Sequence, residues 1–255
     1  MMTTTDLGRF LADYTAWLWG CGATCTRIEK NVRRIAAAYG YHIDITVMPV
    51  HVTVALYSPE NENREIFSNR TAPCGINFDL NTRLSALSWA VSDARLPLEE
   101  AHERFDHIIS RHYADGARIL LLASLANACF CGLFKGDAMA MTIVLLATMA
   151  GYFLKQRLLR HKVDVRITFF VCAFVSAAIC SGAMIFGWSD TPAICVATSV
   201  LYLIPGVPYL NATSDLIDRH YLCAFSRFMD AVVLTASLGA GLILAIFMMK
   251  IDMTW

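Results

Sequence analysis

The sequence predicts an α+β cytoplasmic amino-terminal domain followed by an all-α membrane domain of five transmembrane helices. Its 255 residues are 56% hydrophobic and its mean hydropathy is +0.49, above the roughly 45–50% apolar content of soluble domains. Charged residues are frequent up to about residue 115, whereas residues 117–251 form apolar runs separated by short polar gaps. We therefore expect one domain over residues 1–115 and the other over residues 116–255.

Two helices are expected at the start of the chain. Apolar residues recur at helical spacing from Phe10 to Leu18, and the stretch 20–22 with its two glycines interrupts the pattern. A second helix begins near Thr24, and Gly40 is suited to end it. Its outer face is basic, with Arg27, Lys30, Arg33 and Arg34.

Alternating apolar and polar residues then predict strands. Residues 43–47 and 50–56 alternate on either side of Pro49, which indicates two strands joined by a tight turn. We expect a polar loop over 58–64 and a short third strand over 65–68. Helical spacing returns over 80–91 and 97–108, which completes an order of two helices, three strands and two helices.

The first domain could hold an enzyme site. Glu103 and His107 are four residues apart on one helical face, with His102 and His112 nearby, so an acid–base or metal role is conceivable. A solvated helix face with an ion pair of that spacing is the simpler interpretation. The chain has no nucleophile elbow, phosphate loop or zinc-protease motif, and its nine cysteines include no C-x-x-C pair. We expect no metal and no cofactor, and the zero net charge gives no reason to expect nucleic acid.

The second domain contains five apolar segments long enough to cross a bilayer. The gap 155–166 is rich in lysine and arginine, so the positive-inside rule places it in the cytoplasm. The amino-terminal residues do not resemble a signal peptide, which agrees with a cytoplasmic amino terminus and leaves the carboxyl terminus outside. An odd number of spans favours a partner chain or an oligomer. The expected spans are about 117–135, 138–154, 167–188, 192–210 and 229–250.

A proline-rich stretch interrupts the fourth span. Pro205, Gly206 and Pro208 cannot lie in an unbroken helix, and Asn211 and Asp215 follow one helical turn apart. A broken helix beside an amide and a carboxylate is a common way to build a polar solute site in a membrane. The same residues could instead end a helix at the water surface, with Asp215 as an ordinary interfacial charge.

Several motifs of the chain resemble the threonine/serine exporter family, and more closely the larger subunit of its split, two-chain bacterial members. The first motif lies in the opening helices, the second opens the third helix, and the third is the broken span. The run 128–134 also resembles the first span of the split subunits. The motif residues are Gly22-Ala23, Arg27-Ile28-Glu29, Arg34-Ile35-Ala36 and Gly40; Asp79-Leu80-Asn81, Leu84 and Leu87; and Pro205 to Pro208 with Asn211 and Asp215.

The resemblance implies a subunit of a bacterial inner-membrane secondary exporter in contact with lipid, driven by the proton motive force. A second, smaller membrane subunit would supply the other half, and the substrate would be a small carboxylate such as succinate or an amino acid such as threonine or serine. The alternatives are a membrane-anchored, hydrolase-like enzyme or a regulatory subunit acting through the first domain. Our own candidate transport residues are Pro205, Gly206, Pro208, Asn211 and Asp215, and those for contact with a partner or between domains are Arg27, Glu29, Arg33 and Arg34.

Overall fold

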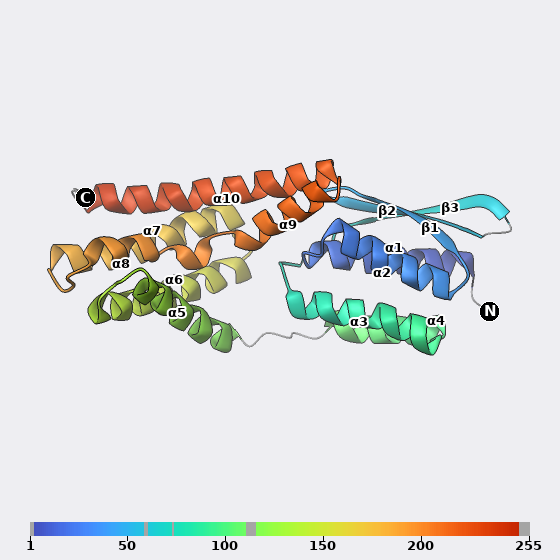
Figure 1. Ribbon diagram of the computed structural model, residues 1–255, viewed down its shortest axis with the longest axis horizontal. Helices are drawn as coiled ribbons and strands as arrows, with labels where there is room; N and C mark the ends of the chain where they lie inside the picture. Colours follow the sequence, from blue (N-terminus) through green and yellow to red (C-terminus); the bar gives the residue numbers. More distant parts are fainter. Residues whose placement is uncertain (1–2, 59–60, 73, 111–115, 250–255) are drawn as a thin grey trace. The chain divides into compact units, whose positions relative to one another are not determined.

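The computed structural model describes residues 3–58, 61–72, 74–110 and 116–249, and its chain divides into two compact units (Figure 1). The first unit contains Met1–Tyr113 and Val207–Met229, and the second contains Ala114–Gly206 and Asp230–Trp255. The segment 207–229 belongs to the first unit although it lies late in the sequence.

The first unit follows the predicted order of two helices, three strands and two helices. Its helix boundaries have local causes: Thr3 accepts a hydrogen bond from the Asp6 N–H at the start of α1, and Gly40 takes a positive φ of 81° after α2. The elements are α1 (Thr4–Gly20), α2 (Cys25–Ala38), β1 (His42–Val47), β2 (His51–Ser58), β3 (Asn61–Arg70), α3 (Phe78–Ala94) and α4 (Leu98–Ser110), joined by α9 (Gly206–Ile217) and the first part of α10 (Tyr221–Met248).

The three strands form one antiparallel sheet in the order β1-β2-β3. The β1–β2 turn closes where Met48 N–H donates to the His51 carbonyl, as the sequence predicts for the Pro49 region. The expected polar loop over 58–64 is wrong in part, because β3 already begins at Asn61. A register shift between Leu56 and Ser58 extends the pairing of β2 with β3 to the end of the hairpin.

The first unit has three layers, with α1 and α2 packed between the sheet and the pair α3–α4. Alternate residues of β2 turn inward, where Val52, Val54 and Leu56 are fully buried. Among the described residues, the largest fully buried side chain is Tyr14 of α1, whose hydroxyl donates a 2.7 Å hydrogen bond to the Leu84 carbonyl in α3. This core holds α2 and α3 side by side, which positions the polar groups described below.

The second unit consists of helices with apolar outer surfaces. Small residues bring its helices together: a side chain added at Gly151 of α6 would overlap the hydroxyls of Tyr202 and Ser176, and one at Gly241 would overlap the Phe170 carbonyl. The helices are α5 (Gly116–Leu133), α6 (Ala138–Arg160), α7 (Val165–Ile185), α8 (Pro192–Thr198), the 3-10 turn η1 (Leu201–Leu203) and the later part of α10.

Among the described residues, four helices are long and apolar enough to cross a membrane: α5, α6, α7 and α10. A fifth candidate is the interrupted pair Pro192–Leu203 and Gly206–Ile217. The chain is therefore a multi-pass membrane protein. The break in the fourth expected span is confirmed, but α8 ends at Thr198, seven residues before the first proline. The last span begins eight residues earlier than expected, at Tyr221.

Candidate functional site

The broken span has a dedicated polar partner inside the second unit. Helix α8 ends at Thr198, so its last carbonyl groups lack helical partners. The buried Asn127 amide of α5 donates 3.2 Å to the Thr198 carbonyl and 2.6 Å to the Thr148 hydroxyl of α6. One side chain thus ties the end of α8 to α5 and α6, which matters because an unpaired carbonyl is costly in lipid.

The turn after α8 is held by a second polar contact. The Tyr202 hydroxyl in η1 and the Ser176 hydroxyl in α7 lie 2.9 Å apart, and Ser176 also donates to the Ala147 carbonyl. Gly151 leaves the space that the two hydroxyls occupy. Pro205 is buried directly after this turn, and α9 starts at Gly206 with Pro208 in its first turn, where the missing N–H costs nothing.

The short gaps between α5 and α6 and between α7 and α8 meet in the structure. Asp137, which caps α6, accepts hydrogen bonds from Ser189 at 2.5 Å and from Thr191 at 2.6 Å. These hydroxyl donors lower the pKa of Asp137 to about 2. The gaps before α6 and before α8 therefore lie together at the same end of the second unit.

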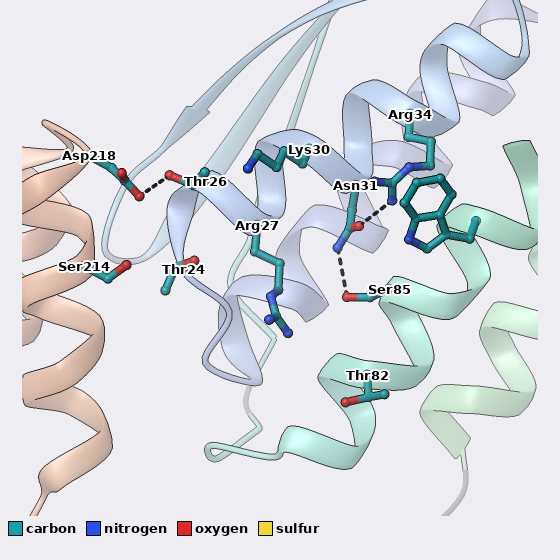
Figure 2. A pocket seen from close by; sticks show the side chains of 11 residues that line it. Thr24, Thr26, Arg27, Lys30, Asn31, Arg34, Thr82, Ser85, Ser214 and Asp218 are labelled. Atoms are coloured by element: carbon teal, nitrogen blue, oxygen red, sulfur yellow. Dashed lines mark hydrogen bonds between the residues drawn. The ribbon is translucent and has the colours of Figure 1, made fainter.

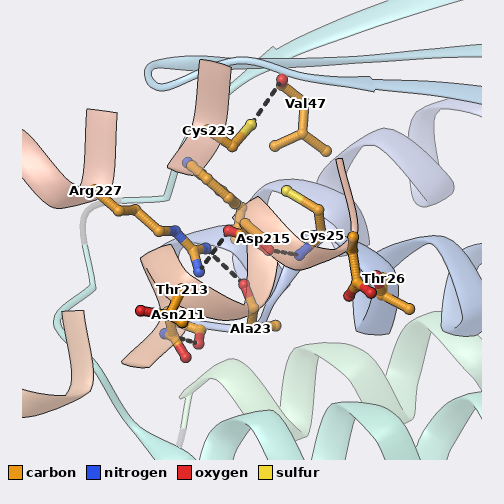
Figure 3. A network of polar contacts seen from close by, with 12 residues as sticks. Ala23, Cys25, Thr26, Val47, Asn211, Thr213, Asp215, Cys223 and Arg227 are labelled. Carbon is orange, nitrogen blue, oxygen red and sulfur yellow. Dashed lines mark hydrogen bonds and ion pairs between the residues drawn. The ribbon is translucent and has the colours of Figure 1, made fainter. Parts of the chain in front are cut away.

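In the first unit, Asp215 of α9 is completely buried at the start of α2 (Figure 3). Its Oδ1 accepts a 2.8 Å hydrogen bond from the backbone N–H of Cys25, the first residue of α2. Thr24 occupies the N-cap position of this helix, but its side chain makes no capping bond. Asp215 thus supplies a carboxylate to the positive end of α2.

Arg227 of α10 neutralises this buried carboxylate. Its Nη1 lies 3.2 Å from Asp215 Oδ2, close enough for an ion pair but without hydrogen-bond geometry. Its Nη2 donates 2.6 Å to the Ala23 carbonyl, and its guanidinium lies 3.9 Å from the centre of the Trp19 ring. The pair therefore joins α9 and α10 to the α1–α2 turn.

Polar contacts surround this pair on the same surface. Asn211 donates 2.8 Å to the Gly22 carbonyl, and Thr26 donates 2.5 Å to the Asp218 carboxylate. His220 Nε2 lies 3.7 Å from Glu29. Asn211 and Asp215 thus lie on one face of α9, as expected, and both bind the α1–α2 turn. The opening motif and the broken-span motif of the sequence meet here.

The expected contact residues of α2 divide between two faces. Arg33 pairs with Glu29 on the outer face at 3.8 Å. Arg27 and Arg34 face α3: Arg27 donates 3.3 Å to Asn81, and Arg34 donates 2.6 Å to the Ser88 hydroxyl. All four residues therefore have partners inside the first unit.

A pocket of about 650 Å³ lies beside this network (Figure 2). We call it the basic pocket, because three cations and one carboxylate line it. Arg34 stacks 3.5 Å above the centre of the Trp89 ring, and Asn31 donates 3.0 Å to Ser85 on the α3 wall. Its lining residues are Thr24, Thr26, Arg27, Lys30, Asn31 and Arg34 of the α2 segment, Thr82, Ser85 and Trp89 of α3, and Ser214 and Asp218 at the end of α9.

The candidate enzyme residues of α4 do not form a site. Glu103 and His107 are exposed, and the pair spaced four apart on this helix is Arg104 with Glu100, at 2.6 Å. His102 packs its ring 4.7 Å from that of Phe10, and His112 lies outside the described residues. Within the described parts of the chain, no group of histidine, cysteine and acidic side chains could hold a metal ion.

Comparison with known proteins decides the family. The ThrE threonine/serine exporter family model matches residues 9–249. The chain belongs to the threonine/serine exporter family. The match includes the α1–α2 turn, the broken span and α10, so the polar networks of both units lie within the family domain. Membership in this family supports the role of a membrane exporter rather than that of an enzyme.

Curated relatives of this exporter-family chain include both short and long proteins. A Klebsiella aerogenes protein named "Probable succinate transporter subunit YjjP" is 30% identical over 89% of this chain and 88% of its own length. A protein of the same name from Escherichia coli K12 is 29% identical over 68% of this chain and 67% of its own length. A Mycobacterium tuberculosis protein named "Probable threonine/serine exporter" is 23% identical over 88% of this chain but only 43% of its own length. No solved structure matches.

Sequence reasoning missed several residues of this exporter-family chain that the structure brings together. Asn127, Thr148 and Ser176 lie in apolar segments. Asn127 and Ser176 bind Thr198 and Tyr202 of the broken span, and Thr148 accepts a hydrogen bond from Asn127. A polar side chain inside a membrane span is itself a signal of function, and an amide in an apolar run could have been singled out on that ground. Arg227 gives a weaker signal in the sequence, because it lies two residues before the last expected span, where a positive charge is common.

Proposed function

We propose that this chain is the larger subunit of a two-chain inner-membrane exporter of small carboxylates, with succinate as the reference substrate. The broken span carries the proposal. Helix α8 stops at Thr198 inside an apolar segment, and a buried amide from α5 holds the carbonyl that the break frees. Such a break is tolerated in lipid only where protein or a water-filled cavity covers it, and secondary transporters bind solutes at breaks of this kind.

The names of two relatives support a partner chain. Both the Klebsiella aerogenes and the Escherichia coli proteins are named as transporter subunits, and their lengths are close to that of this chain. A second, smaller membrane subunit would therefore complete the exporter. The apolar outer surfaces of α5 and α10, little covered within the chain, leave room for that subunit and for lipid.

Orientation follows from charge. Five cations lie around the α6–α7 junction: Lys155, Arg157 and Arg160 at the end of α6, Lys162 in the turn after it, and Arg166 at the start of α7. The positive-inside rule assigns this junction to the cytoplasm. The amino-terminal domain is then cytoplasmic, and the joined gaps at Asp137 and Thr191 face outside with the carboxyl terminus. With no nucleotide site in the sequence, the proton motive force would drive export.

The roles at the site follow from the contacts. A substrate carboxylate would meet the start of α9 near Pro205, Gly206 and Pro208, where the helix dipole is positive. Asn211 and Asp215 lie about one and two helical turns after Pro208. They would act as the gate, since they hold α9 to the α1–α2 turn. Opening would require the Asp215–Arg227 pair to loosen.

Efflux from cells lacking their own exporters tests this proposal. The chain would be expressed with and without its smaller partner, in cells preloaded with labelled succinate or threonine. We expect succinate efflux that needs both chains and stops when a protonophore collapses the proton gradient. Preferred efflux of threonine would change the substrate class. A lack of efflux of either label, with both chains inserted, would contradict the exporter proposal.

A further inference from the structure

The basic pocket of the first unit carries more positive charge than its neighbours neutralise. Arg27, Lys30 and Arg34 line it, and none of the three forms an ion pair with a carboxylate among the described residues. The one acidic group in the lining, Asp218, already accepts a hydrogen bond from Thr26. Two positive charges thus remain unbalanced, which favours an anionic ligand.

The spacing of the cations favours an elongated anion over a compact one. Arg27 and Arg34 are seven residues apart on α2, which corresponds to roughly 10 Å along a helix, and Lys30 lies between them. A single phosphate can reach only part of this row. A short chain with a carboxylate at each end can contact two of the cations at once, and arginine binds a carboxylate through two parallel hydrogen bonds.

The opposite wall, α3, supplies neutral polar groups and holds one of the α2 cations in place. Thr82 and Ser85 present hydroxyls from α3. The Trp89 ring and the Ser88 hydroxyl hold the Arg34 guanidinium in place, so less conformational entropy is lost when a ligand binds it. At about 650 Å³, the pocket is within the size range of small-molecule sites.

We propose that the basic pocket binds a small dicarboxylate and senses its level on the side of the membrane where this domain lies. The choice of a dicarboxylate as the ligand rests on the proposed function, whereas the charge and spacing of the cations favour an elongated anion independently of that function. Because Ser214 and Asp218 bring α9 into the lining, a bound ligand contacts α2, α3 and α9 together. Occupancy therefore stabilises α9 on α2, at the surface where Asp215 and Asn211 bind.

A zwitterionic amino acid is the competing ligand. Its ammonium group could approach Asp218 while its carboxylate met Arg27. Such a ligand has no net charge, so it would leave the two excess positive charges of the pocket unbalanced. A dicarboxylate balances both.

Titration calorimetry on the purified full chain tests the inference, with succinate, phosphate, propionate and threonine as separate ligands. We expect saturable binding of succinate that is tighter than binding of the other three. Arg27→Gln and Lys30→Gln should each weaken it about tenfold, the effect of losing one charged hydrogen bond. Arg33→Gln removes the same charge from the outer face of the same helix and should bind succinate as the wild type does.

Each other outcome overturns the inference. Equal or tighter binding of phosphate would assign the pocket to compact anions, and tighter binding of threonine would assign it to amino acids. Succinate binding that survives in both pocket variants would come from another site. Suppose that Arg27→Gln or Lys30→Gln no longer binds succinate, yet cells that express this variant with the smaller partner chain export succinate normally. That result would refute sensing by the pocket while leaving the exporter proposal intact.

Discussion

Asp215 caps a helix that lies 190 residues away in the sequence. Its Oδ1 accepts a 2.8 Å hydrogen bond from the Cys25 N–H, the first of α2, while the N-cap residue Thr24 makes no side-chain bond of its own. The cap is a buried carboxylate whose charge Arg227 neutralises from α10. The start of α2 and the pairing of α9 with α10 therefore depend on one another.

Replacing Asp215 by asparagine tests this dependence. The amide oxygen can still accept from Cys25, but Arg227 loses its counter-charge in a buried place, which costs about 3–5 kcal/mol. We expect the Asp215→Asn chain to insert in the membrane, to melt at a lower temperature in detergent, and to lose export.

Two further variants separate charge from folding. Asp215→Asn combined with Arg227→Gln removes both charges, so most of the lost stability should return while export stays absent. Asp218→Asn changes an exposed acid three residues away and should leave the melting temperature nearly unchanged. Normal export by Asp215→Asn would remove the gating role of this carboxylate.

The elements of the first unit could largely be predicted because their signals are local. The helical spacing of apolar residues in α2 and the stop at Gly40 lie within one stretch of chain, as does the alternation of β1 and β2 around Pro49. The early start of β3 could not be predicted, since residues 61–64 are polar and become a strand only by pairing with β2.

The sequence pointed to Asn211 and Asp215 as candidate residues but did not reveal which residues they contact. Asn211 and Asp215 were chosen because they follow the prolines, and that choice could not reveal that they bind Gly22 and Cys25. These contacts join segments about 190 residues apart, and no spacing rule connects them. The basic pocket was hidden for the same reason, because α2, α3 and α9 each supply only part of its lining.

Asn127 should be essential for the break in the fourth span. Asn127→Leu keeps the size of the side chain but leaves the Thr198 carbonyl without its donor, which costs about 1–3 kcal/mol for a buried group. Thr148→Val removes only the second partner of the amide and should cost less. Thermal melts in detergent would rank the two, with the exposed Cys129→Ala on the same helix as the control. Equal losses for Thr148→Val and Asn127→Leu would refute the role of the Thr198 contact.

Alkaline pH should destabilise the first unit. Burial raises the pKa of the Cys21 thiol from 9.0 to about 12 and that of Tyr39 from 10.0 to about 12. Above pH 9 the unfolded chain releases these protons before the folded chain does. Stability is therefore fully present below pH 9 and falls as pH rises towards 12.

Melting temperatures measured from pH 8 to pH 11 would check this expectation. Cys21→Ala removes one buried titrating group, so its melting temperature should fall less steeply with pH than that of the wild type. Cys129→Ala changes an exposed thiol of the second unit and should reproduce the wild-type slope. An unchanged slope in Cys21→Ala would show that this thiol does not couple proton release to unfolding.

Gly151 should tolerate no side chain, because a methyl group there would overlap the hydroxyls of Tyr202 and Ser176. Overpacking of this kind typically costs about 1–3 kcal/mol, so Gly151→Ala should lower the melting temperature and displace the turn before Pro205, with loss of export. Gly239→Ala is the matched control, since a methyl group there meets open space. Tyr202→Phe with Ser176→Ala removes both hydroxyls, and adding Gly151→Ala to that pair should cost less than it costs alone. If the costs simply add, the two hydroxyls do not set the spacing of α6 against the broken span.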